Sequence, residues 1–234
     1  MLREKLKNRS SQAWMALAVA AALSLAFVSV ATAVVYVYGN KFASGADYRE
    51  IDQVGGGGRD CDASYRRESQ SMRVEVSGET LCEYSPPVIG DSGQPDHEIV
   101  VEGRILERTP KNVRKQAYLA ARVRVGEGDF YELRVTPKGR KFRLSRSPEA
   151  AAGLPLSGES NAIKPFGARN TLRLRVKGND VTAFVNGDSV ASFTDPNASQ
   201  VEGRRVSFGV GSTKDVSNGP IGVFKQVRVG VPNP

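Results

Sequence analysis

Residues 181–190, VTAFVNGDSV, decide which fold this chain is expected to adopt. Apolar and polar residues alternate on both sides of Asn186-Gly187, and this pair is the preferred centre of a type I′ turn because both residues tolerate positive φ. The stretch therefore predicts two short strands that fold back on each other as a hairpin, and the hairpin is expected to belong to a larger sheet.

Strand signals of the same kind recur at short intervals along residues 61–231, where no stretch has convincing helical periodicity. We expect about eleven short strands with polar turns between them. Clear turn signals occur at residues 126–129, 137–140 and 77–78. The last of these is expected to close a hairpin between its flanking strands, SMRVEV and TLCEY.

This pattern predicts an all-β fold, an antiparallel β-sandwich or jelly roll. A parallel α/β fold is not expected, because no crossover helices are visible in the sequence. Within residues 119–125, 130–135 and 172–176, apolar side chains occupy every second position and arginines lie among the alternate ones. One face of each strand is therefore expected to build the core, while the other carries arginines.

The arginine-bearing face is the candidate ligand-binding surface. Guanidinium groups bind carboxylate or phosphate in bidentate fashion, and interleaved aromatic rings stack on sugars. Such a surface suits an anionic wall polymer or an acidic protein partner; the alternative is a solvated face of cross-strand Arg–Glu pairs without a ligand. The sequence leaves open whether the residues share one sheet. The candidates are Arg122, Arg124, Arg134, Arg143, Arg173, Arg175, Tyr118, Phe130 and Phe184.

The N-terminus has the pattern of a membrane anchor. Residues 1–12 are basic, and residues 13–38 contain no charge. As a helix, residues 13–38 would rise about 39 Å, more than the roughly 30 Å hydrocarbon core of a bilayer. Trp14 lies at one end of the run, and Tyr36 and Tyr38 lie at the other, as in an interfacial aromatic belt. We expect a single-pass transmembrane helix with a cytoplasmic N-terminus and an extracytoplasmic C-terminal domain.

Two other interpretations of this segment stay open. Ala31-Thr32-Ala33 matches the cleavage site of a signal peptide, although the apolar run is longer than a usual h-region and continues past the site. The segment could also be a buried globular helix. Residues 39–60 lack apolar periodicity and include four consecutive glycines, which predicts a flexible stalk with at most one short strand before the domain at 61–231.

The cysteine count, the single histidine and the net charge limit which sites and ligands are expected. Outside a membrane, Cys61 and Cys82 favour one disulfide, with two free thiols as the alternative. A zinc site would need more ligands than the single histidine, His97, supplies, so neither a metal nor a cofactor is expected. The net charge is +8, but no Lys/Arg run marks a nucleic-acid arm, and no nucleic-acid partner is expected.

Four segments carry a resemblance to a known class: FYELRVTPKGRKFRLSR (130–146), NAIKPFGARNTLRLRVKGNDVTAFVNGDSVASF (161–193), GRRVSFGVGS (203–212) and GVFKQVRVG (222–230). Their order resembles the concanavalin-like (laminin-G-like) jelly rolls of the 3-keto-disaccharide-hydrolase-like class, over roughly residues 116–229. Such domains occur in bacterial envelope proteins, including the outer parts of membrane-anchored serine/threonine kinases. There they look like sensor or carbohydrate-binding modules. The resemblance implies a bacterial surface domain with a curved sheet able to face a glycan. It does not imply catalysis, because fold and function separate easily.

No catalytic constellation is visible. Glycoside hydrolysis needs two flanking carboxylates, and the Glu-x-Asp-x-x-Glu spacing of the resembling glucanases is absent. Glu132 stands alone in its strand and is expected to pair with a neighbouring arginine. His97 is expected to be a surface turn residue, and no G-x-S-x-G elbow accompanies it.

The leading hypothesis is therefore a membrane-anchored extracytoplasmic binding or sensing module for cell-wall glycan or an envelope protein. A glycan-processing hydrolase of the same fold and a purely structural wall-spanning protein are the rival hypotheses.

Overall fold

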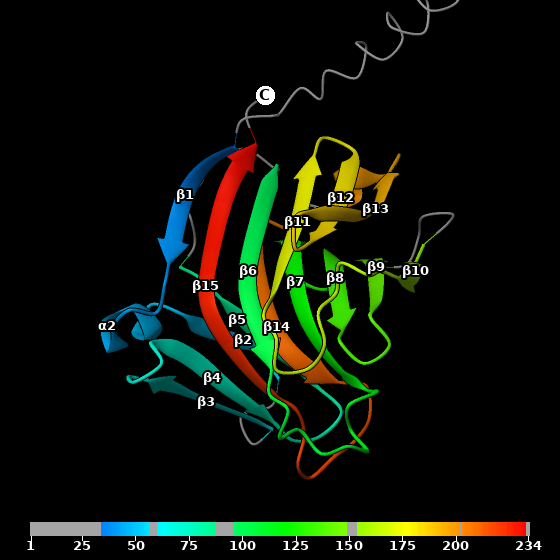
Figure 1. Ribbon diagram of the computed structural model, residues 1–234. Helices are drawn as coiled ribbons and strands as arrows, with labels where there is room; N and C mark the ends of the chain where they lie inside the picture. Colours follow the sequence, from blue (N-terminus) through cyan, green and yellow to red (C-terminus); the bar gives the residue numbers. More distant parts are fainter. Residues whose placement is uncertain (1–33, 57–59, 88–95, 149–153, 202, 233–234) are drawn as a thin grey trace, which may run out of the picture. The chain divides into compact units, whose positions relative to one another are not determined.

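The computed structural model describes residues 34–56, 60–87, 96–148, 154–201 and 203–232. These residues form two antiparallel sheets that pack face to face (Figure 1). The expected all-β sandwich is confirmed. The basic tail at residues 1–12 and most of the predicted membrane helix lie outside the described residues.

The first sheet has eight strands in the order β13-β12-β11-β6-β15-β4-β3, and β1 also pairs with β15. The strand β15 is long enough to pair with β4 over its first half and with β1 over its second half. The strands are β1 (Val34–Asn40), β3 (Cys61–Arg66), β4 (Ser71–Val76), β6 (His97–Ile105), β11 (Asn170–Lys177), β12 (Asp180–Val185), β13 (Asp188–Thr194) and β15 (Ile221–Pro232).

The second sheet has seven strands in the order β10-β9-β8-β7-β14-β5-β2. A short helix α2 (Gly45–Arg49) precedes β2, and a 3-10 turn η1 (Ala198–Gln200) precedes β14. The strands are β2 (Asp52–Gly55), β5 (Leu81–Ser85), β7 (Ala117–Val125), β8 (Phe130–Thr136), β9 (Lys141–Ser147), β10 (Leu156–Glu159) and β14 (Arg205–Ser212).

The predicted hairpin of β12 and β13 is present. Asn186 and Gly187 have φ values of 52° and 97°, as a type I′ turn requires. The Asn186 side chain also accepts a hydrogen bond from the Thr171 amide, which ties the turn to β11. The turns at residues 126–129 and 137–140 likewise connect paired strands, β7 with β8 and β8 with β9.

The predicted alternation of faces also holds in the sheet interior. The apolar side chains of β7, β8 and β11 point between the sheets and are almost fully buried. They include Leu119, Ala121, Val123, Tyr131, Leu133, Val135, Leu172, Leu174 and Val176.

The expected hairpin at Ser77-Gly78 is wrong. The flanking strands β4 and β5 belong to different sheets, so this turn crosses from one layer to the other. The Gly78 amide donates to the Val216 carbonyl and not across a two-strand ladder. Turn residues indicate that the chain changes direction, but they do not say which sheet receives the next strand.

The segment before Cys61 differs from the prediction as well. Residues 34–38 belong to β1, so the predicted transmembrane helix does not extend to Tyr38. Residues 39–60 are not a stalk, since α2 and β2 lie within them and β2 pairs with β5. Backbone pairing with β15 and β5, together with a capping box of Ser44 and Asp47 on α2, orders a segment that lacks apolar periodicity. No helix in the described residues is long and apolar enough to cross a membrane.

The disulfide predicted from composition is present. Cys61 on β3 and Cys82 on β5 are bonded, with their Cα atoms 5.5 Å apart. Since β3 and β5 lie in different sheets, the bond joins the two layers.

A buried polar cluster lies between the sheets. Arg146 and Asp195 have fully buried side chains, with Nη1 and Oδ2 3.4 Å apart. The Tyr131 hydroxyl donates to the same Oδ2 at 2.7 Å, and the Asn197 amide donates to Oδ1 at 2.8 Å. Asp195 therefore neutralises a buried guanidinium and anchors the turn that leads into β14.

Replacing Asp195 by alanine is expected to lower the free energy of unfolding by about 3–5 kcal/mol, because it leaves the Arg146 charge buried and uncompensated. Asp188→Ala, at an exposed position of the same strand region, is the matched control and is expected to stay within about 0.5 kcal/mol of the parent. Urea unfolding of the full chain measures both. Equal losses in the two variants would contradict the role given to Asp195.

Candidate binding face

The predicted arginine face is divided between the two sheets. Register and alternation place Arg122, Arg134 and Arg143 on the outer side of the seven-stranded sheet, with Tyr118 and Phe130. Arg173, Arg175 and Phe184 lie on the outer side of the eight-stranded sheet instead. The predicted outward orientation holds for these residues, and the question of whether they share one sheet is answered: they are divided between two.

Arg124 belongs to neither surface. Its φ of 51° and the register shift between β7 and β14 break the alternation at the end of β7. Its side chain is only 4% exposed, and it donates to the backbone carbonyls of Ala198 and Gly178. Arg124 therefore holds loops together, and its prediction as a ligand-binding residue is not supported by this geometry.

An ion-pair chain organises the outer side of the seven-stranded sheet. The Arg122 guanidinium lies between two carboxylates: Nη1 donates to Glu83 Oε2 at 2.8 Å, and Nε donates to Glu132 Oε2 at 2.8 Å. The Glu132 side chain is 1% exposed, and its other oxygen accepts from Arg134. Glu83 accepts from the Ser207 hydroxyl in addition. The expectation that Glu132 pairs with a neighbouring arginine is confirmed.

Aromatic rings fix the planes of these guanidinium groups. The Arg122 guanidinium carbon lies 3.9 Å from the Phe130 ring centroid, and that of Arg134 lies 4.6 Å from the Tyr118 centroid. Burial raises the pKa of the Tyr118 hydroxyl, an effect that the Arg134 charge partly offsets. Because Tyr118 is buried beneath Arg134, it serves as a support for the arginine and not as a sugar-stacking platform.

Arg134 and Arg143 form an unusual cross-strand pair. They are directly opposite each other on β8 and β9, and Arg143 is exposed. Like charges at opposite positions repel. Two guanidinium groups are therefore brought close together on the outer side of the sheet. We call Glu83, Arg122, Glu132, Arg134 and Arg143 the arginine surface.

A hollow of about 220 Å³ adjoins the arginine surface. Its lining includes Glu83, Arg122, Phe130, Arg205 and Ser207. The hollow provides room beside the ion-pair chain for part of a ligand.

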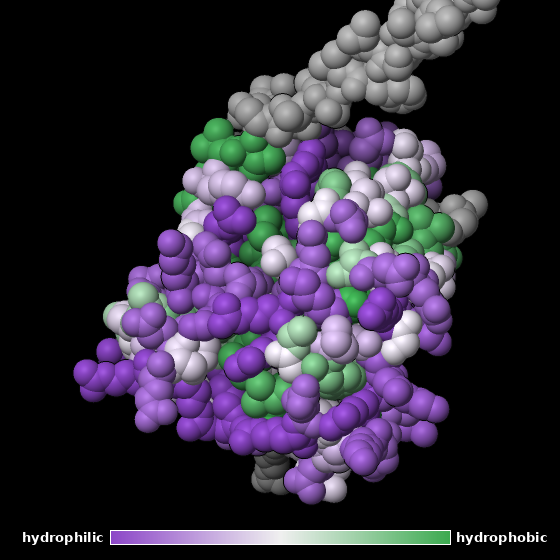
Figure 2. Space-filling model, viewed as in Figure 1, coloured by the Kyte–Doolittle hydropathy of each residue, from purple (hydrophilic) through white to green (hydrophobic). Residues whose placement is uncertain are grey.

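The eight-stranded sheet repeats the arrangement around one carboxylate. Glu98 has a fully buried side chain, and its Oε2 accepts from Nε of Arg173 at 2.7 Å and from Nε of Arg175 at 2.9 Å. The Tyr36 hydroxyl of β1 donates to the other oxygen at 3.1 Å. The Arg173 guanidinium lies over the Phe184 ring. This face is mostly hydrophilic in Figure 2, which is viewed from its side of the molecule.

His97 was predicted to be a surface turn residue, and this is wrong. It is the first residue of β6, pairs with Val176 of β11, and is 5% exposed. Pro95-Asp96 predicted a turn that would include His97, but β6 already begins at His97. Among the described residues, no group of three or more His, Cys, Asp or Glu side chains could hold a metal ion.

Glu83 and Glu98 were not among the residues predicted from the sequence. Each is a carboxylate within an apolar strand, TLCEY or HEIVVEG, which was the one available signal. Glu83 reaches a partner 39 residues away, and Glu98 reaches one 75 residues away. Such separations depend on strand order, which the sequence pattern does not give.

Comparisons with known proteins identify the fold. No protein-family model matches the sequence, and no curated protein matches it. A protein of unknown function with a galectin-like fold from Bacillus subtilis is 12% identical, with a TM-score of 0.57 over 85% of this chain and 97% of that one. The carbohydrate binding module CBM66 from Bacillus subtilis is 14% identical, with a TM-score of 0.51 over 77% and 95%.

The catalytic domain of an endo-1,3-β-glucanase (laminarinase) from Thermotoga petrophila is 11% identical, with a TM-score of 0.59 over 87% of this chain and all (100%) of that domain. At such low identities these likenesses show the fold alone. The chain therefore has a galectin-like or concanavalin-like jelly-roll fold, and its function has to be argued from its own residues.

The geometry of the arginine surface favours binding over acid–base chemistry. A glycosidase needs one carboxyl group free to donate a proton to the leaving oxygen and a second carboxylate free to act as base or nucleophile. Both oxygens of Glu132 accept from arginines, and both oxygens of Glu83 accept from Arg122 or Ser207. The two carboxylates are therefore engaged in orienting donors.

Replacing Arg122 by methionine is expected to lower the free energy of unfolding by about 3–5 kcal/mol, because two desolvated carboxylates lose their shared partner. Combining the change with Glu132→Gln is expected to recover part of the loss, since one of the unpaired charges is removed.

The control is Arg169→Met, which breaks a pair with Glu102 whose side chains are 50% and 31% exposed. A surface pair of this kind contributes about 0–1 kcal/mol. Urea unfolding of the three variants tests the chain of ion pairs; a loss in the Arg122 variant no larger than in the control would refute it.

Proposed function

We propose that this chain is a non-catalytic module that binds an acidic polysaccharide of the bacterial envelope through the arginine surface. The observation that carries the proposal is the Arg134–Arg143 pair. The two arginines occupy directly opposite positions of adjacent strands on the outer side of the sheet, so their like charges lie close together. A uronate, sulfate or phosphate group placed between them would relieve the repulsion and accept charge-assisted hydrogen bonds.

The similar structures support a glycan ligand. They include a carbohydrate binding module and several glucanases or laminarinases, all with this jelly-roll fold. The proposal includes the resemblance to the 3-keto-disaccharide-hydrolase-like class. Binding to an acidic envelope protein would use the same charges, but the hollow beside Phe130 and the similarity to these glycan-directed proteins favour a saccharide.

A hydrolase is the alternative function, since Glu83 and Glu132 lie on one face with a single guanidinium between them. Each of these carboxylates would have to leave an arginine before it could act on a glycosidic bond. The binding experiment below therefore also measures the release of reducing ends.

We further propose that the apolar N-terminal segment holds this domain at the outer side of the cell membrane. Three observations support the proposal: the uncharged run of residues 13–38, which includes the start of β1, the Cys61–Cys82 disulfide, which is typical of oxidising compartments, and the exposed Val35 and Val37 on β1. Figure 2 shows hydrophobic residues at the end of the molecule where β1 starts.

Exposure outside the membrane is tested with a C-terminal epitope tag and a protease added to intact producing cells. We expect the tag to be lost before lysis, because an extracytoplasmic domain is accessible to the enzyme. A cytoplasmic protein serves as the control for cell integrity. Protection of the tag until the cells are lysed would contradict the proposed topology.

Ligand binding is tested with polygalacturonate as an acidic polymer and dextran as a neutral one, using the full chain. Arg143→Gln is expected to weaken polygalacturonate binding by about tenfold, the equivalent of one charge-assisted hydrogen bond. Arg169→Gln, which removes an exposed arginine just before β11 of the other sheet, is the matched control and should change binding by less than about twofold. High salt should weaken binding further.

Three results would overturn the proposal: no binding of polygalacturonate, equal losses in the two variants, or steady release of reducing ends that depends on Glu132. The last would favour the hydrolase.

A further inference from the structure

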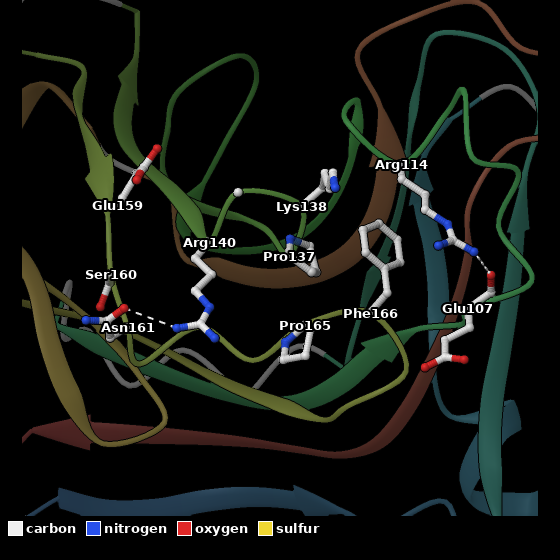
Figure 3. A pocket seen from close by; sticks show the side chains of 11 residues that line it. Glu107, Arg114, Pro137, Lys138, Arg140, Glu159, Ser160, Asn161, Pro165 and Phe166 are labelled. Atoms are coloured by element: carbon white, nitrogen blue, oxygen red, sulfur yellow. Dashed lines mark hydrogen bonds between the residues drawn. The ribbon is translucent and has the colours of Figure 1, made fainter.

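A groove of about 740 Å³ lies away from the arginine surface, at the end of the sandwich where loops from both sheets meet (Figure 3). Its walls come from the β6–β7 loop, the β8–β9 turn and the loop between β10 and β11. We call it the loop groove. Its volume is within the range of about 300–1,000 Å³ that small-molecule sites occupy.

The walls of the loop groove are fixed by hydrogen bonds. The Ser160 amide donates to the Arg140 carbonyl at 2.9 Å, which joins the β10–β11 loop to the β8–β9 turn. The Gly167 amide donates to the Ile105 carbonyl at 2.9 Å, which joins the other end of the loop to β6. The Arg114 Nε donates to the Thr109 carbonyl at 3.0 Å. A groove that is formed before the ligand arrives loses little conformational entropy on binding.

The middle of the loop groove is apolar and its two sides are polar. In Figure 3, Pro137, Pro165 and Phe166 lie in the middle, between Arg140 on one side and Arg114 on the other. The Arg114 guanidinium carbon lies 5.5 Å from the Phe166 ring centroid, which holds the ring in place.

The Arg140 side of the groove carries several hydrogen-bonding groups. Arg140 Nη1 donates to Asn161 Oδ1 at 3.1 Å, so both side chains are oriented. Ser160 and Glu159 complete this side. These groups together offer donors and acceptors at one edge of an apolar strip.

The loop groove is lined by three basic residues, Arg114, Lys138 and Arg140, and by two acidic residues, Glu107 and Glu159. The arginine surface has the same ratio of charges, but the loop groove has in addition an apolar strip at its centre. An uncharged ligand with hydroxyl groups along one edge and an apolar face would match both the polar side and the apolar strip. A sugar ring has this distribution of groups.

We propose that the loop groove is a second binding site, for an uncharged sugar residue that packs on Phe166 and is hydrogen-bonded by Arg140 and Asn161. The site is separate from the arginine surface and does not depend on it. The ligand ring covers the apolar strip of Phe166 and the two prolines, and its hydroxyls face the Arg140 side.

The test uses three uncharged oligosaccharides of different linkage, namely laminarihexaose, cellohexaose and maltohexaose, with the full chain kept in a detergent that has no sugar head group. Calorimetric titration is expected to show binding of at least one of them. Phe166→Ala should weaken it by about tenfold or more, as removal of a central aromatic contact does. Asn161→Ala should weaken it as well, and this exposed position provides a variant that leaves the fold intact.

The control is Lys164→Ala, an exposed position in the same loop that does not line the groove; it should leave binding within about twofold. Arg143→Gln and about 0.5 M NaCl should also have little effect, because neither the arginine surface nor net charge contributes at this site. Loss of polygalacturonate binding alone would therefore refute the proposed function and leave the loop groove unaffected.

The proposal is overturned if none of the three oligosaccharides binds, if the Phe166 and Asn161 variants bind as well as the Lys164 variant, or if salt abolishes binding. Salt sensitivity together with a loss in the Arg143 variant would show that the neutral sugars occupy the arginine surface instead.

Discussion

The structure depends on carboxylates that are buried on the outer sides of the sheets and must be neutralised there. A desolvated carboxylate is strongly unfavourable unless it is paired and hydrogen-bonded. Glu132 and Glu98 meet this requirement with two arginines each, and the aromatic rings of Tyr118, Phe130 and Phe184 support those arginines. The guanidinium groups are consequently held in defined planes and not distributed over many rotamers. The same constraint explains why so many arginines occur in the strands of a domain with only a moderate net charge.

The two proposed sites differ in how their charged residues are arranged. On the arginine surface, Arg143 lies directly opposite Arg134, so two guanidinium groups are close together. In the loop groove, acidic and basic side chains surround an apolar strip. A jelly roll with two such sites can hold one polymer that carries both acidic and neutral units, or two different polymers at once. Two weak contacts on one rigid body give an avidity that neither contact has alone.

Local sequence patterns predicted the turns at residues 126–129, 137–140 and 186–187, the inward faces of the strands and the disulfide, because each of these depends on neighbouring residues or on composition. They did not predict which sheet receives a strand, so the Ser77-Gly78 hairpin was wrong, and the position of Arg173 and Arg175 on the other sheet could not be predicted. The edge strand β1 was missed because it is held by backbone pairing to the distant β15, which leaves little periodicity in its side chains. Arg124 was misplaced because a bulge is a property of two paired strands, and alternation in one of them does not reveal it.

The pairing of β1 with the end of β15 has a mechanical consequence. Val34 lies opposite Pro232, and the ladder continues to Asn40 opposite Val227. The inter-strand hydrogen bonds of an antiparallel pair are perpendicular to the strands. A pull along β1 would therefore load these bonds in parallel, as shear, whereas a sideways pull would break them one after another from Val34. The hydrogen bond from the Tyr36 hydroxyl to Glu98 adds a further contact near the N-terminal end of β1. Resistance of the domain to stretching thus depends on the direction of the force on its first strand.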